Sequence, residues 1–256
     1  MLHHPAPSLM NGKGISYAVD PLMPVEPIPL KVTWKFRDLR LESLRADPSA
    51  YLSTLEREQK FSNAQWNQQI LDPFRNYLIC HMSPRSAEST KDMTATSVDN
   101  WAEEEDWVGM LLLSGPYLKA NYGATPLLES TAVGSDVEET RWHLSALYLQ
   151  PGNRCDESAV AIHEAVLSSL RLWTDNLLAT VFDEATGLER PKKARLAGLL
   201  PTENHQLSAL YEGLVGKTIG WADRALGCKI AGIEDVTGED PDPELHMRVM
   251  ERIIDC

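Results

Sequence analysis

The sequence has few cysteines, and they form no pattern. The four cysteines are widely scattered, with no C-x-x-C pair and no histidine at metal-ligand spacing. A disulfide framework and a zinc site are therefore excluded as the basis of the fold. We expect reduced thiols, as in cytoplasmic proteins, and no bound metal.

Long apolar runs are also missing. No stretch approaches the ~18 apolar residues that a membrane-spanning helix requires, so we expect no membrane partner. The opening segment MLHHPAPSLMNGKG lacks a basic region followed by an apolar region, which is the pattern of a secretory signal. These features predict a soluble protein located in the cytoplasm.

Basic residues are scarce relative to acidic ones. The chain has 24 Lys and Arg against 37 Asp and Glu, which gives a formal net charge of −13 at pH 7. A nucleic-acid partner requires a basic surface, so nucleic-acid binding is disfavoured. An acidic surface attracts cationic or amine-bearing ligands weakly, although it also simply keeps a protein in solution. We expect a small-molecule substrate, and the sequence sets no oligomeric state.

The apolar content is that of an ordinary globular domain. The chain has 256 residues, of which 43% are hydrophobic, and this suffices for one sizeable core. Six prolines and a lack of periodicity predict an extended arm over residues 1–30. The main domain is expected over residues 31–233, and an acidic tail with a short closing helix over residues 234–256.

Side-chain periodicity predicts the order of the elements. Strands are expected at Lys31–Phe36, Asn76–Met82, Trp107–Leu113, Arg141–Gln150 and Ala194–Leu200. Helices are expected after Asp38, around Tyr51–Leu55, after Ser62, from Asp156 onward, over Leu207–Leu214 and over Glu244–Ile254. We expect segment 83–106 to be a mobile surface insertion and segment 117–138 to be a lid or binding loop. This order indicates an α/β domain with a mixed sheet and helices on its faces.

The segment Arg141–Gln150 (RWHLSALYLQ) is the clearest strand. Alternation places its residues on two faces: Trp142, Leu144, Ala146 and Tyr148 on one, and His143, Ser145, Leu147 and Leu149 on the other.

Three segments, in order and at matching spacing, resemble the GNAT superfamily of N-acetyltransferases. They are RDLRLESLRADPSAYLSTLEREQKFSNAQW, WHLSALYLQPGNRCDESAVAIHEAVL and RLAGLLPTENHQLSALYEGLVGKTIG. They match the family's opening helices, then its core strand with the pyrophosphate loop and helix, then its strand, P-x-N turn, helix and LYxxxG ending. The resemblance implies one GNAT-like domain with a mixed, mostly antiparallel central sheet. It also implies an acetyl-CoA-dependent N-acetyltransferase that acts on a small amine by direct transfer in a ternary complex.

The family's pyrophosphate loop, R-G-x-G-x-G/A, aligns with the segment RCDESA that begins at Arg154. In such a loop the unpaired N–H groups and the dipole of a helix start bind an anion. The resemblance therefore implies that Arg154, Ser158 and Ala159 contact the cofactor.

The loop departs from the family pattern at the residues nearest the anion. Cys155 and Glu157 replace both leading glycines, and Asp156 adds a further negative charge. Two carboxylates would repel a pyrophosphate, but they also suit a helix N-terminus as capping residues. Two alternatives stay open: acyl-CoA is held mainly by its pantetheine and adenine ends, or the fold has lost the cofactor.

The resemblance implies two more cofactor contacts. The family's core strand splays from its neighbour, and its exposed backbone hydrogen-bonds the pantetheine chain as an added strand would. Leu147, Tyr148 and Leu149 match that strand end. Asn204 matches a cofactor-contacting asparagine, although P-T-E-N is also an ordinary turn.

Three residues are the candidates for acid–base chemistry. Tyr211 matches the family tyrosine that protonates the departing thiolate, and its alternative is a helix tyrosine packed against the sheet. His143 and Glu139 on the central strand are the candidates for the general base, and the alternative for His143 is a structural role.

Two further functions remain open. In the first alternative, the fold has been repurposed for a cofactor-independent step on a small molecule, such as a cyclisation or isomerisation in secondary metabolism. The second alternative is a non-catalytic ligand-binding domain. The adjacent carboxylates of Asp156 and Glu157 favour these alternatives over acyl transfer.

Overall fold

The computed structural model describes residues 15–23, 26–84, 100–122, 133–181, 191–201, 205–222 and 247–255. Most of the predicted insertion 83–106, the middle of loop 117–138, the acidic part of the tail and Asn204 lie outside these ranges. No helix within them is long and apolar enough to cross a membrane.

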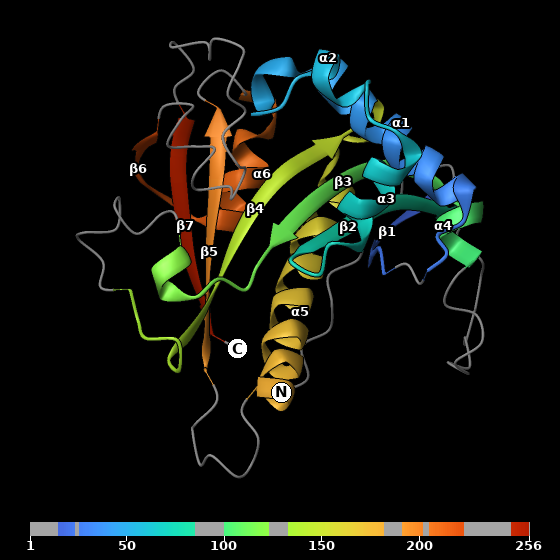
Figure 1. The fold of residues 1–256 in the computed structure, drawn as a ribbon. Helices are drawn as coiled ribbons and strands as arrows, with labels where there is room; N and C mark the ends of the chain where they lie inside the picture. The colour runs from blue at the N-terminus through green and yellow to red at the C-terminus, as the bar shows by residue number, and fades with distance from the viewer. Residues whose placement is uncertain are drawn as a thin grey trace, which may run out of the picture.

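The described strands form one seven-stranded mixed sheet in the order β1-β2-β3-β4-β5-β7-β6 (Figure 1). Their bounds are Ile15–Pro21 (β1), Arg75–Pro84 (β2), Asp106–Ser114 (β3), Glu139–Leu149 (β4), Lys193–Pro201 (β5), Lys217–Ala222 (β6) and Met247–Asp255 (β7). Neighbouring strands are antiparallel except β4 and β5, which are parallel. The predicted fold class, α/β with a mixed and mostly antiparallel sheet, is confirmed.

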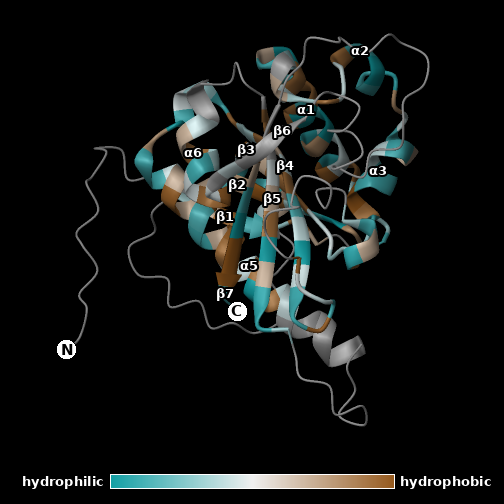
Figure 2. Ribbon diagram, turned by 90° about the vertical axis from the view of Figure 1, so that its left-hand side faces the viewer, coloured by the Kyte–Doolittle hydropathy of each residue, from teal (hydrophilic) through white to brown (hydrophobic). Residues whose placement is uncertain are grey.

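Helices cover both faces of the sheet. They are Leu30–Ala46 (α1), Leu55–Glu58 (α2), Asn63–Leu71 (α3), Asn100–Glu104 (α4), Asp156–Val181 (α5) and His205–Val215 (α6). One core, which includes Phe36 and Trp66, lies between the sheet and α1, α3 and α4. The second, which includes Trp142 and Val166, lies between the sheet and α5 and α6. Figure 2 shows α3 and α6 on opposite sides of the strands.

Several predicted elements are confirmed. The strands expected at 76–82, 107–113, 141–150 and 194–200 are β2, β3, β4 and β5. Ser62 caps α3 with a capping box, in which its side chain accepts from the N–H of Gln65 while the Gln65 side chain accepts from the N–H of Ser62. The helices expected from Asp156 and around Leu207–Leu214 are α5 and α6.

The predicted strand at Lys31–Phe36 is wrong, because these residues belong to α1. The buried residues of α1 include Val32, Phe36, Leu39 and Ser43, which recur every three or four positions. Six alternating residues are too few to distinguish a strand from one face of a helix. The predicted cap, Asp38, therefore lies inside the helix.

Both ends of the chain contribute strands that were not predicted. Residues 15–21 of the expected arm form β1, which pairs with β2 over its whole length. The closing helix expected at Glu244–Ile254 is wrong, because residues 247–255 form β7, which is paired on one side with β5 and on the other with β6. Its apolar residues, Val249, Met250, Ile253 and Ile254, have a spacing that suits a helix equally well.

A bulge at Ala146 changes the faces of β4. Ala146 has a φ of 53°, and the register between β3 and β4 shifts between Met110 and Leu112. The extra residue reverses the alternation from this point. Leu147 and Leu149 consequently share a core with Trp142 and Leu144, whereas Ala146 and Tyr148 face the other core. The alternation predicted for this strand is wrong after Ser145.

Beyond this bulge, β4 and β5 separate, as Figure 1 shows. Their parallel pairing runs from Glu139 opposite Lys193 to Leu144 opposite Gly198 and stops there. β4 continues to Leu149, so among the residues that the structure describes its last residues have no strand partner on the side of β5. The predicted splaying of this strand is confirmed.

Ala146 is a position where backbone conformation sets the cost of a substitution. A non-glycine residue in the left-handed region is strained by roughly 1–3 kcal/mol, and a β-branched residue is strained most. We expect Ala146→Val to lower the free energy of unfolding by about 2 kcal/mol, and Ala146→Gly to leave it unchanged or raise it. Urea denaturation of both variants measures this. A valine variant as stable as the wild type would contradict the strained bulge.

Candidate functional site

The opening between β4 and β5 holds two tyrosine hydroxyl groups that meet the backbone of Leu147. Tyr51 follows the short 3₁₀ helix Pro48–Ala50, and its hydroxyl donates to the Leu147 carbonyl at 3.3 Å. The Tyr211 hydroxyl, from α6, hydrogen-bonds the backbone of the same residue. Both side chains are buried. The splayed strand end is therefore clamped by one residue from each side of the opening.

Both phenols keep their protons at neutral pH. Burial raises the pKa of Tyr51 to about 12. Burial also raises the pKa of Tyr211, and the neighbouring Tyr51 raises it further, while the bond to Leu147 opposes these effects. A buried phenol that stays protonated can serve as a proton donor or as a hydrogen-bond donor.

A cavity of about 370 Å³ opens beside these tyrosines, and we call it the acceptor pocket. It lies among α1–α3, β2–β4 and α6. Its lining residues include Tyr51, Tyr211, Ser145, Ala146, Phe61, Phe74, Tyr77, Tyr117, Arg40, Arg57, Glu58, Asp72 and Arg75. The volume and the mixture of aromatic with a few polar groups are typical of small-molecule sites.

A buried ion pair fixes the wall of this pocket next to Tyr51. The guanidinium of Arg40 in α1 donates to both carboxylate oxygens of Glu58 in α2, at 2.9 and 2.7 Å. The same guanidinium lies over the Tyr51 ring, 4.8 Å from its centroid. Sequence reasoning missed all three residues as site residues, since only their meeting in space gives them a role.

A second cavity of about 470 Å³ lies between the start of α5 and α6. Leu149, Arg154 and Ala159, all predicted to contact the cofactor, line it together with Asp156. The structure thus brings these three residues together where the resemblance places the pyrophosphate. The backbone of Leu147 lies at the neighbouring strand end.

The N-terminus of α5 uses its own side chains to satisfy its backbone groups. The buried hydroxyl of Ser158 lies 2.7 Å from the Asn153 carbonyl and accepts from the N–H of Cys155 at 3.2 Å. The Glu157 carboxylate accepts from its own N–H, which lowers the pKa of this carboxyl. The N–H of Ala159 donates to the Cys155 carbonyl at 3.1 Å. The side chains of Ser158 and Glu157 therefore already accept from two N–H groups at this helix start.

The remaining predicted cofactor residues lie as follows. Arg154 Nε donates to the Leu149 carbonyl at 2.8 Å, so its side chain closes over the strand end. The Tyr148 side chain points to the opposite core, and its hydroxyl donates to Glu42 at 2.9 Å. The backbone of Tyr148 pairs with Met110 of β3, so neither it nor the side chain faces the expected cofactor path.

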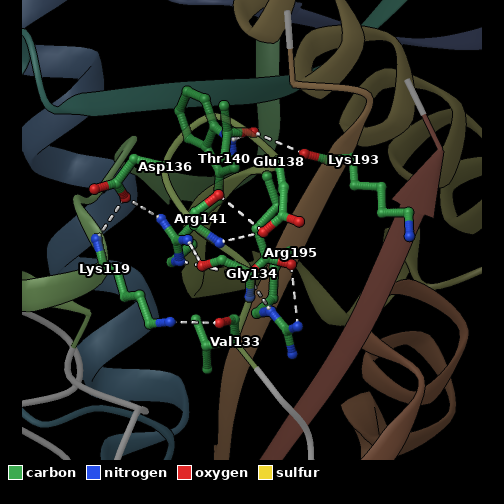
Figure 3. A network of polar contacts seen from close by, with 12 residues as sticks. Lys119, Val133, Gly134, Asp136, Glu138, Thr140, Arg141, Lys193 and Arg195 are labelled. Carbon is green, nitrogen blue, oxygen red and sulfur yellow. Dashed lines mark hydrogen bonds and ion pairs between the residues drawn. The ribbon is translucent and has the colours of Figure 1, made fainter. Parts of the chain in front are cut away.

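Glu139 is part of a buried ion-pair network at the other end of β4. Arg195 donates to its two carboxylate oxygens at 2.8 and 3.0 Å, and Gly134 N–H donates to one of them at 3.0 Å. Arg195 also pairs with Glu251 at 2.8 Å. Figure 3 shows Arg195 and neighbouring Arg141 in this network. Eight residues of strand, about 25 Å, separate Glu139 from Leu147, so the structure places this base candidate away from the opening.

His143 is enclosed by aromatic rings. Tyr122 stacks on it with ring centroids 4.8 Å apart, and Tyr117 lies at 4.9 Å. Neither ring nitrogen has a hydrogen-bond partner within the described residues, and the side chain is only 3% exposed. Burial lowers its pKa to about 3. His143 does not line the acceptor pocket, so the geometry does not support the expectation of a general base on β4.

The burial of His143 makes stability depend on pH. The unfolded chain binds a proton at this residue below about pH 6.5, whereas the folded protein does not until about pH 3. Stability from neutral His143 is therefore fully present above pH 6.5 and is lost as the pH falls. Between pH 7 and pH 5 we expect the wild type to lose about 2 kcal/mol more than His143→Phe. Urea denaturation of both proteins at the two pH values measures the difference, and parallel pH profiles would contradict it.

Comparison with known proteins gives matches only among solved structures. No protein-family model matches the sequence, and no curated protein matches it. Three of the structures found are a ribosomal-protein-S5-alanine acetyltransferase from Vibrio fischeri, NAA60 from Arabidopsis thaliana in complex with acetyl-CoA, and an acetyltransferase of the GNAT family from Streptococcus pneumoniae.

The likeness of these structures to this chain is weak. The TM-scores are 0.48, 0.46 and 0.42, and the identities 10%, 10% and 12%, in the same order. Each alignment covers 93% of this chain and 92%, 99% and 99% of the other. At such low similarity they identify neither the substrate nor the cofactor of this chain.

Proposed function

We propose that this chain is an acyl-CoA-dependent acyltransferase that acylates the amine of a small molecule by direct attack in a ternary complex. One observation carries the proposal: beyond Ala146 the edge of β4 leaves β5, and the protonated hydroxyl of Tyr211 lies at that edge.

The strand edge fits an extended chain with amide groups. Leu147 and Leu149 lie beyond the last pair between β4 and β5, so a pantetheine chain would bind there by β-augmentation. The edge is now covered by side chains, since Tyr51 and Arg154 donate to its two carbonyl oxygens. On binding, the amide groups of the pantetheine chain would replace Tyr51 and Arg154 as partners of these carbonyl oxygens. No buried backbone group would then lose its hydrogen bond.

Acyl-CoA, when bound, supplies an acyl group activated as a thioester. The residues around the opening would keep the protons in balance, since Tyr211 gives one proton to the departing thiolate and regains the one that the acylated amine loses. Tyr211 holds a proton on its hydroxyl oxygen, where a departing thiolate requires one. Tyr51 keeps the backbone of Leu147 in place through its own hydrogen bond. The acceptor pocket, which shares both tyrosines, holds the amine.

Tyr211→Phe tests the proposed acid. The change keeps the packed ring and removes only the hydroxyl, so turnover should fall by about 10²–10⁴-fold, the usual contribution of general acid catalysis. Acyl-CoA affinity should hold, and the melting temperature should fall by only about 2–4 °C, because one hydrogen bond to Leu147 is lost. Steady-state kinetics, calorimetric binding and a thermal melt measure all three.

The matched control is Tyr148→Phe, which removes a hydroxyl on the opposite face of β4 that bonds only Glu42 among the described residues. This variant should retain its turnover. A Tyr211→Phe variant with at least half of the wild-type rate would end the assignment of Tyr211 as the acid.

The start of α5 favours a second candidate function, a cofactor-independent step on a small molecule or simple ligand binding. Asp156 and Glu157 occupy the first turn of the helix, and Glu157 already accepts from its own N–H. A pyrophosphate there would meet negative charge and occupied donors. Acyl transfer then requires that the pantetheine and adenine ends supply most of the affinity.

Titration with acetyl-CoA by calorimetry, with CoA and desulfo-CoA as controls, separates the two candidates. We expect binding to the wild type, and a dissociation constant several-fold lower when Asp156→Gly and Glu157→Gly are combined, because repulsion at the helix start is removed.

A control removes the same two charges elsewhere: Asp38→Asn with Glu56→Gln, both on exposed residues outside the two cavities. Its affinity should equal that of the wild type. Undetectable acetyl-CoA binding by both the wild type and the glycine variant would favour the cofactor-independent candidate.

A further inference from the structure

The acceptor pocket has a charge balance opposite to that of the whole chain. Its lining includes three arginines and two carboxylates, namely Arg40, Arg57, Arg75, Glu58 and Asp72. The chain as a whole carries a net charge of −13. The pocket therefore has a local surplus of one positive charge on a chain that is acidic as a whole.

Two of these arginines are neutralised by partners in the wall. Arg40 binds both oxygens of Glu58, and both side chains are largely buried. Arg75 Nε lies 3.3 Å from Asp72, three residues before it. Each of these pairs cancels its own charge and contributes to the shape of the wall.

Arg57 is the arginine that remains. It is half-buried on α2, lines the pocket, and has no ion pair within the described residues. An arginine so placed presents a planar fork of donors that matches a carboxylate in bidentate geometry. It also disfavours a polycationic ligand, because like charges repel at short range.

The rest of the lining combines aromatic and aliphatic residues with four polar ones, Ser53, Gln69, Ser114 and Ser145. Phe61, Phe74 and Tyr117 line the pocket together with Tyr51 and Tyr211. Leu52 and Leu112 add aliphatic surface. An apolar body of modest size suits this lining and a volume of about 370 Å³. The pocket reaches Tyr211 and Ser145 at the strand opening, where the amine would react.

We propose that the acceptor is an amino acid with an apolar side chain, whose carboxylate is bound by Arg57 and whose amine faces Tyr211. The proposal rests on the proposed acyltransferase function, since it names the acceptor for that same pocket. Arg57 is a specificity residue in this arrangement. The acidic composition of the chain predicts only a weak attraction of cationic or amine-bearing ligands, and the lining of the pocket adds a place for a carboxylate.

The test measures equilibrium binding to the full chain in the absence of any acyl donor. The probes are L-phenylalanine, L-leucine and L-tryptophan. Two molecules each lack one group of phenylalanine: 2-phenylethylamine lacks the carboxylate and 3-phenylpropionate lacks the amine. Spermidine serves as the polycation. At least one amino acid should bind, and 2-phenylethylamine should bind at least about tenfold more weakly than phenylalanine, as expected for the loss of a charged hydrogen bond.

Substitutions at Arg57 test whether this residue binds the carboxylate of the amino acid. Arg57→Gln should weaken phenylalanine and 3-phenylpropionate by about tenfold and leave 2-phenylethylamine unchanged. Arg57→Lys should fall between the wild type and the glutamine variant, because it keeps the charge and loses the fork. The control is Arg37→Gln, on exposed α1 surface outside the pocket, and melting temperatures check that each variant folds.

Three results would overturn the proposal: no binding of any of the three amino acids, binding of spermidine or 2-phenylethylamine as tight as phenylalanine, or unchanged phenylalanine affinity in Arg57→Gln. These outcomes are independent of the acyl donor. Loss of acetyl-CoA binding with retained amino-acid binding would instead contradict the acyltransferase function and leave the carboxylate site intact.

Discussion

The left-handed backbone at Ala146 is the constraint on which the site depends. Before it, β4 is an ordinary central strand that pairs with β5 and faces the α5 side with Trp142 and Leu144. After it, the alternation reverses and the pairing with β5 ends. The end of the buried strand thus becomes an edge that no longer pairs with β5, and side chains bond its carbonyl oxygens instead. Such strain persists only where the surroundings enforce it, which is common at functional sites.

The surroundings of this edge are held by polar groups that are themselves buried. Arg40 and Glu58 join α1 to α2 and fix the position of Tyr51, which reaches the Leu147 carbonyl. Buried ion pairs contribute little net stability, but removal of one partner is strongly destabilising, since it leaves a buried charge without its counter-ion. This pair therefore acts mainly to hold one arrangement of the wall. The network of Glu139 with Arg195 does the same at the far end of β4, where it joins β4, β5 and β7.

The sequence predicts the central part of the fold well. Strands β2 and β3 contain short apolar runs, β4 begins with an alternating pattern, and Ser62 and the first residues of α5 carry recognisable capping signals. The errors arise where a short pattern fits two periods. Lys31–Phe36 and the residues of β7 satisfy both a strand and a helix, and only pairing across the sheet decides between them. The bulge was missed because alanine carries no local signal for a left-handed backbone.

The candidate site is less predictable than the fold, for a physical reason. Tyr211 could be identified by its resemblance to a family residue, whereas Tyr51, Arg57 and Glu58 lie far from it in sequence and have no motif of their own. Conversely, His143 and Glu139 are residue types that can act as a general base, and both lie on the central strand. In the structure, however, His143 is buried against aromatic rings and Glu139 is ion-paired with Arg195. Composition does not describe the pocket, because net charge belongs to the whole chain and the pocket lining has its own balance.

Amide hydrogen–deuterium exchange of the segment Ser145–Leu149 tests the central claim most directly, because it reports on the backbone that is proposed to hold the acyl donor. The account predicts that saturating acetyl-CoA slows exchange of this segment, through new hydrogen bonds along the edge of β4, while exchange of the paired segment Glu139–Leu144 stays unchanged. Equal exchange of Ser145–Leu149 with and without acetyl-CoA would contradict the account.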